Sequence, residues 1–281
     1  MKKYFPYINY IVAAAGALGA VLRFRLLSAG CDEKGLYPAD HPGWIGYLIL
    51  TAAVLVLVYL MTRNVEEDPT WLRNFPQPTQ RDSDVSWHLS CAKNCFRAAG
   101  YALAAIGILF YGLTFHYGES TFQSILYWGA FVCGATLLLT AAQSFTGKVP
   151  VSLAYPVICA YLALLLFTLG KDFSDEPEML RFLPQLFALA ASALAAYQLW
   201  SFAVGCGNRK KSLFWSLTAA YLCLAAVPGN HPMFATLGAW HLLSHPVLLL
   251  PPAETIETEE MIETDETVES IVTDETEEET L

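Results

Sequence analysis

The stretch WIGYLILTAAVLVLVYLM, from Trp44 to Met61, decides the fold. It holds no Asp, Glu, Lys or Arg, and it is close to the length of about 20 mostly apolar residues that a helix needs to cross a bilayer. A helix satisfies its backbone hydrogen bonds within its own segment, which is a requirement for any segment surrounded by lipid. The stretch therefore predicts a transmembrane helix.

Seven further apolar runs follow the same pattern. They extend from Ile8 to Leu26, Phe96 to Phe115, Phe122 to Ala142, Val151 to Leu169, Leu183 to Val204, Leu213 to Val227, and Met233 to Leu250. Pro246 predicts that the last run is kinked or stops short of the far side. The fold class predicted for residues 1–250 is therefore an all-α polytopic transmembrane helix bundle, with eight spans favoured and seven as the alternative.

The distribution of Lys and Arg predicts the orientation, because short loops rich in these residues stay in the cytoplasm. With a cytoplasmic N-terminus, 11 of the 16 basic residues fall on the cytoplasmic side and 5 outside. The long cytoplasmic loop covers about residues 62–95. We therefore expect a multi-pass protein of the cell (plasma) membrane. Eight spans place the C-terminal segment in the cytoplasm, whereas seven place it outside.

The C-terminal segment ETIETEEMIETDETVESIVTDETEEETL, from Glu254 to Leu281, holds thirteen acidic residues and no basic one. The net charge of −10 comes from this segment, since the first 253 residues carry 16 basic and 13 acidic side chains. Repelling charges and little apolar surface predict a disordered acidic tail over residues 251–281. Such blocks are often interaction tails, so residues 253–281 are expected to contact a cytosolic protein. A solvated tail without a specific partner is the alternative.

Three threonines of the tail each precede two acidic residues, and they are Thr258, Thr264 and Thr273. A phosphate group on such a threonine would add charge that an Arg cluster on a partner protein could bind. The sequence therefore predicts these three positions as modification sites.

The end of the long loop reads WHLSCAKNC and offers a candidate metal site. His88, Cys91 and Cys95 are spaced so that one face of a helix can present all three. A closed zinc site needs a fourth ligand, and no CxxC pair supplies it. Reversible acylation of the two cysteines is an alternative, and so is the role of small residues at a helix start.

His241 and His245 in WHLLSHP form a second candidate pair, four residues apart on one helix face. This spacing is suited to a metal ion or a proton relay. The Glu of an HExxH metalloprotease is absent, because Leu242 stands at its position. The competing interpretation is a neutral histidine bonded to a neighbouring helix.

Two predicted spans, Ile8 to Leu26 and Leu183 to Val204, contain several small residues. Small residues form faces that allow helices to approach closely, and they are Ala13, Gly16, Ala20, Ala188, Ala191, Ser192, Ala195 and Ala196. We expect these faces to pack within the chain. Arg23 and Arg25 lie at the outer end of the first span and are expected to extend toward the membrane surface.

The predicted function follows largely from what the spans lack. None has an Asp, Glu or Lys in its interior, which disfavours ion-coupled carriers. No Walker A, Rossmann or serine-nucleophile motif and no nucleic-acid module is present, so no cofactor or nucleic-acid partner is expected. The leading hypothesis is a non-enzymatic membrane protein whose tail contacts partners. The alternative is a carrier or channel for a neutral or weakly polar solute that uses Gln185 and Gln198, and a membrane redox or metal enzyme is the third.

Overall fold

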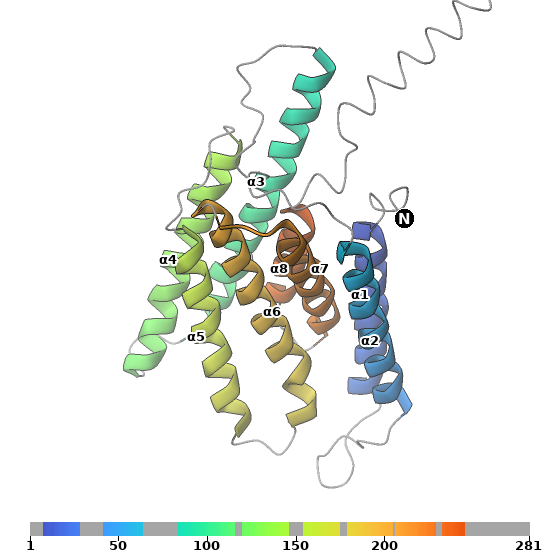
Figure 1. Cartoon of the computed structure of the whole chain (residues 1–281). Coiled ribbons are helices and arrows are strands. Elements are labelled where there is room, and N and C mark those ends of the chain that lie inside the picture. The colour runs from blue at the N-terminus through green and yellow to red at the C-terminus, as the bar shows by residue number, and fades with distance from the viewer. Residues whose placement is uncertain are drawn as a thin grey trace, which may run out of the picture.

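The computed structural model describes residues 8–28, 42–63, 84–115, 120–145, 154–174, 179–204, 206–228 and 232–244. Within these residues the chain forms eight α-helices and no strand (Figure 1). The helices are α1 (Ile8–Ser28), α2 (Pro42–Arg63), α3 (Asp84–Gly112), α4 (Thr121–Phe145), α5 (Ala154–Ser174), α6 (Met179–Ala203), α7 (Arg209–Ala226) and α8 (Pro232–Leu243). The predicted all-α fold is confirmed, and each apolar run coincides largely with one helix.

Helix boundaries follow local chemistry. Pro42 and Pro232 are the first residues of α2 and α8, where the missing proline N–H costs nothing. Asn208 caps α7, because its side-chain oxygen accepts a hydrogen bond from the Lys211 backbone N–H at 3.0 Å. Pro184 lies inside α6, which begins at Met179, four residues before the apolar run.

α3 also begins earlier than expected. The predicted loop covers residues 62–95, but α3 starts at Asp84 and therefore includes the WHLSCAKNC stretch. No proline or glycine interrupts the sequence between Asp84 and Arg97, so nothing in the backbone stops the helix from continuing upstream of the apolar run. The predicted loop of residues 62–95 therefore overlaps α2 at its start and α3 at its end.

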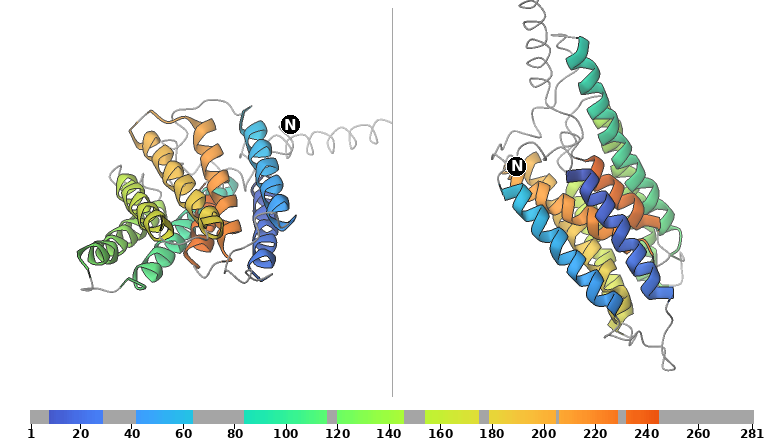
Figure 2. Two further views of the ribbon diagram at one scale, coloured as in Figure 1. Left: turned by 90° about the horizontal axis from the view of Figure 1, so that it is seen from below. Right: turned by 90° about the vertical axis from the view of Figure 1, so that its right-hand side faces the viewer.

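The helices from α3 to α8 form a ring of neighbours, each packed on the next, and α8 packs back on α3. α1 and α2 pack on each other and join the ring through α7. Successive helices alternate in direction (Figures 1 and 2). The Asn9 side-chain amide donates to the Leu242 carbonyl at 3.4 Å, so the last turn of α8 lies beside the first turn of α1. We call this end of the bundle, where α1 begins and α8 ends, the entry face.

Six of the eight helices, α1 to α6, are long and apolar enough to cross a membrane. Helix α7 carries three basic residues in its first turn, and α8 has 12 residues. At 1.5 Å per residue α8 is about 18 Å long, against a hydrocarbon core of about 30 Å. Six helices are therefore compatible with the predicted multi-span pattern, while the count of eight spans stays a prediction.

Small residues bring α1 and α7 into close contact. A Cβ atom added at Gly16 would lie 2.7 Å from the Leu224 Cβ atom, and one added at Gly19 would lie 3.0 Å from the Ala225 Cβ atom. The predicted small face of α6 is buried as well, at Ala188, Ala191, Ser192, Ala195 and Ala196. Both faces pack within the chain, as the sequence analysis expected.

Arg23 contradicts the prediction for the first span. Its side chain is 1% exposed, and its Nη1 donates to the Ala226 carbonyl at 2.8 Å. Carbonyls at the C-terminal end of a helix lack intrahelical donors, so the guanidinium satisfies the end of α7 and does not extend toward the membrane surface. Arg25 is exposed, and the difference arises because only Arg23 lies on the face of α1 that meets α7.

Candidate functional site

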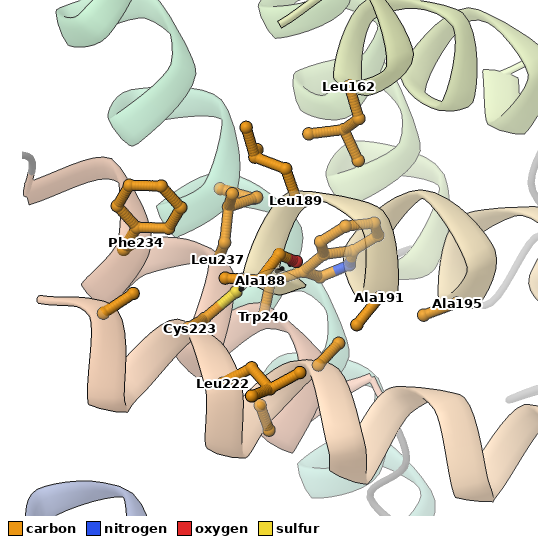
Figure 3. Close-up of a cluster of buried hydrophobic side chains, with 14 of the residues drawn as sticks. Leu162, Ala188, Leu189, Ala191, Ala195, Leu222, Cys223, Phe234, Leu237 and Trp240 are labelled. Atoms are coloured by element: carbon orange, nitrogen blue, oxygen red, sulfur yellow. Dashed lines mark hydrogen bonds between the residues drawn. The ribbon is translucent and has the colours of Figure 1, made fainter. Parts of the chain in front are cut away.

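The interior between α5, α6, α7 and α8 is filled by apolar side chains (Figure 3). The buried residues shown there include Leu162, Ala188, Leu189, Ala191, Leu222, Cys223, Phe234, Leu237 and Trp240. The Ser192 Oγ atom lies 3.2 Å from the Cys223 sulfur. The Cys223 thiol also donates to the Ala188 carbonyl at 3.9 Å. The polar groups of this region thus face one another across a packed core.

The predicted solute-binding residues Gln185 and Gln198 both lie on α6. Gln185 is 2% exposed, whereas Gln198 is half-buried, and about 20 Å of helix separates them at 1.5 Å per residue. Neither of two cavities, about 610 Å³ between α4 and α5 and about 460 Å³ between α2 and α7, is lined by Gln185, Gln198 or His241. The larger one opens outward beside exposed residues such as Trp128. A solute path that uses Gln185 and Gln198 therefore stays a prediction.

His241 is fully buried on α8, and its neighbour Trp240 packs against it with ring centroids 4.4 Å apart. In the part of the chain that the structure describes, neither ring nitrogen of His241 has a hydrogen-bond partner. The expectation that it bonds to a neighbouring helix is therefore not supported. His245, the second residue of the predicted pair, lies outside the described residues, so a joint site with His241 stays a prediction.

A polar cluster that the sequence analysis missed lies where α3, α5 and α8 meet. The Tyr101 and Tyr155 hydroxyls are 2.8 Å apart, and the Arg97 guanidinium, 7% exposed, interacts electrostatically with both. Trp240 packs on Tyr101 with ring centroids 5.8 Å apart. The predicted span from Phe96 contains Arg97, and Tyr101 one turn further on the same helix face is a signal for a buried pair. The cluster ties three helices together near the entry face.

The predicted metal residues of α3 lie on one continuous helix, as expected. Cys91 and Cys95 are exposed free thiols, and the Cys95 side chain contacts that of Cys91. The side chain of His88 lies outside the description. Among the described residues, no three His, Cys, Asp or Glu side chains come together in a way that could hold a metal ion, so a complete site would need ligands from elsewhere.

The three threonines predicted as modification sites, Thr258, Thr264 and Thr273, lie outside the described residues, as does the whole acidic segment. The described chain ends at Ser244, directly after α8, at the entry face.

Comparison with known proteins adds no family: the chain matches no protein-family model, no curated protein and no solved structure.

Proposed function

We infer that this chain is a multi-pass protein of the plasma membrane that presents its acidic C-terminal segment at the cytoplasmic face, where the segment binds a basic protein surface. The hydrogen bond between Asn9 and the Leu242 carbonyl carries this proposal. It joins the start of α1 to the end of α8, so an even number of crossings separates them, whether α7 and α8 cross fully or return as a hairpin. The segment after residue 244 then leaves on the side where the chain begins.

The basic residues support the cytoplasmic assignment of that side. Arg63 ends α2 and Arg209, Lys210 and Lys211 begin α7, all at the entry face, which is the side on which the sequence places 11 of 16 basic residues. Loops rich in Lys and Arg stay in the cytoplasm. Thirteen acidic residues would steer a partner with clustered Lys or Arg toward the membrane, with an attraction that falls as salt rises.

The packed interior supports an interaction role over transport. Apolar side chains from four helices fill the region where a solute path would run, and the predicted polar residues of such a path do not meet. The second and third hypotheses therefore have no specific observation in their favour.

The test combines topology and binding. In sealed vesicles, protease added to the cytoplasmic side should remove residues 253–281, and protease added to the opposite side should not. Full-length protein should retain a cytosolic partner that the chain lacking residues 253–281 loses. A matched variant in which the acidic residues of the tail are replaced by Asn and Gln should lose it too, because the charge and not the length is recognised.

Digestion from the extracellular side would exclude the proposed orientation. Equal capture by the neutralised variant would exclude charge recognition, even with the topology correct. Intact mass of the purified protein is a separate test of the predicted modification. We expect the mass of at least one added phosphate, carried by Thr258, Thr264 or Thr273.

A further inference from the structure

A groove at the entry face lies between the last turn of α2 and the first turns of α7. It has a volume of about 460 Å³ and is lined by Tyr59, Thr62, Arg63, Lys210, Lys211, Phe214 and Trp215. The two helices are in contact and are joined deeper in the bundle by the Thr51 and Tyr221 hydroxyls, 2.9 Å apart. The packing of α2 against α7 therefore fixes the two walls of the groove.

Three cationic side chains gather at the groove, and none of its seven lining residues is acidic. Arg63 and Lys211 are exposed and Lys210 is half-buried. The Asn208 cap holds the first turn of α7 through its bond to the Lys211 N–H, which fixes where the two lysine side chains begin. Converging cations of this kind are suited to a phosphate group.

Aromatic side chains line the groove one helical turn deeper than the cations. Tyr59 precedes Arg63 by four residues on α2, while Phe214 and Trp215 follow Lys210 and Lys211 by four residues on α7. Residues four apart share a helix face, so each cation has a ring directly beneath it. The Tyr59 and Phe214 rings pack edge to face with their centroids 6.4 Å apart, and the Phe214 and Trp215 ring centroids are 5.2 Å apart.

This layering matches the interface of a bilayer, where aromatic rings lie at the level of the headgroups and Lys and Arg reach the phosphates. We propose that the groove binds the headgroup of an anionic phospholipid, with the phosphate on Arg63, Lys210 and Lys211 and the glycerol region against the three rings. This site is independent of the tail and of its partner.

The aromatic wall distinguishes a lipid from the acidic tail as the occupant. Tyr59 is 56% exposed, and the apolar side chains beside it on α2, Val56 and Leu60, are exposed as well, so the groove opens onto the surface that faces lipid. Carboxylates of the tail would neutralise the cations, but thirteen acidic residues in 28 offer little to cover the rings. A phospholipid satisfies both parts of the groove.

The experiment is native mass spectrometry of the full chain, stripped of lipid in detergent and titrated with phosphatidylglycerol or phosphatidylcholine. We expect the wild type to retain phosphatidylglycerol preferentially. Lys210→Gln and Lys211→Gln should each lower that preference about five-fold, because each substitution removes one surface cation that attracts the anionic lipid. Arg25→Gln is the matched control, because Arg25 is an exposed cation at the opposite end of α1, and it should keep the wild-type preference.

Two results would overturn the proposal. One is an equal preference for phosphatidylglycerol in the wild type and in the combined Arg63→Gln, Lys210→Gln, Lys211→Gln variant, provided that both melt at the same temperature without lipid. The other is a zero-length cross-link between Lys210 or Lys211 and an acidic residue of the tail that excess phosphatidylglycerol does not displace, which would assign the groove to the tail. Cross-linking suppressed by phosphatidylglycerol, together with the expected loss in the lysine variants, supports the lipid.

Discussion

Helices α2 and α7 are neighbours with opposite relations between hydropathy and burial. α2 is strongly apolar, yet less than a quarter of its apolar stretch is buried in the protein. α7 begins with three basic residues and is less apolar, yet 12 of its 18 residues are buried. The more apolar helix therefore faces outward and the less apolar one occupies the centre.

The reason is that lipid chains are as apolar as a leucine side chain, so hydropathy alone gives no drive toward the interior. Central positions go to helices whose small and polar residues allow close approach and interhelical hydrogen bonds. α7 has this composition, with buried Ser212, Ser216, Ala219 and Ala220. α2 instead exposes large residues such as Ile49, which contact lipid favourably.

The strongest test of this comparison replaces a tryptophan in the centre and one at the periphery. Trp240 of α8 is fully buried, and Trp128 of α4 is 56% exposed. We expect Trp240→Ala to lower the free energy of unfolding by about 3–5 kcal/mol through lost contacts and a cavity, and Trp128→Ala by about 0.5 kcal/mol or less. Chemical unfolding in detergent measures both, and comparable losses would show that α8 is not central.

An intermediate effect is expected at the contact between α1 and α7. Arg23→Gln removes the donor to the Ala226 carbonyl and should cost about 1.5–3 kcal/mol, the range for a hydrogen bond to a charged group. Arg25→Gln, on the exposed side of the same helix, should change stability little. Thermal melting of the two variants in one detergent separates them, and the comparison fails if Arg25→Gln is the more damaging change.

The smallest effect concerns two helix glycines. A Cβ atom at Gly107 would overlap the Thr236 side chain of α8, whereas one at Gly46 has nothing within 4 Å. Gly107→Ala should destabilise by about 1–3 kcal/mol through overpacking, reduced by about 1 kcal/mol of helix propensity. Gly46→Ala should stabilise the protein by about 1 kcal/mol, because it gains the helix propensity of alanine without a steric clash. Adding Thr236→Ala to Gly107→Ala should restore part of the loss, and no recovery would indicate another cause.

Much of the fold could be predicted from the sequence, because each helix is encoded by a local apolar run. Within the described residues, each of the eight runs overlaps one helix, and the small face of α6 is buried as expected. The groove between α2 and α7 was harder to predict from the sequence. Arg63, Lys210 and Lys211 were counted only as indicators of orientation, although the aromatic residue one turn deeper than each of them was visible in the sequence.

The sequence by itself determined that this chain forms apolar helices suited to lipid, with an acidic segment at its end, because hydropathy and charge are properties of consecutive residues. Only the tertiary structure decided which helices lie at the centre, that Arg23 is buried against the end of α7 while Arg25 is exposed, and that cations of α2 and α7 share one groove. These outcomes depend on which faces meet between helices far apart in the chain, and side-chain fit and interhelical hydrogen bonds select those faces.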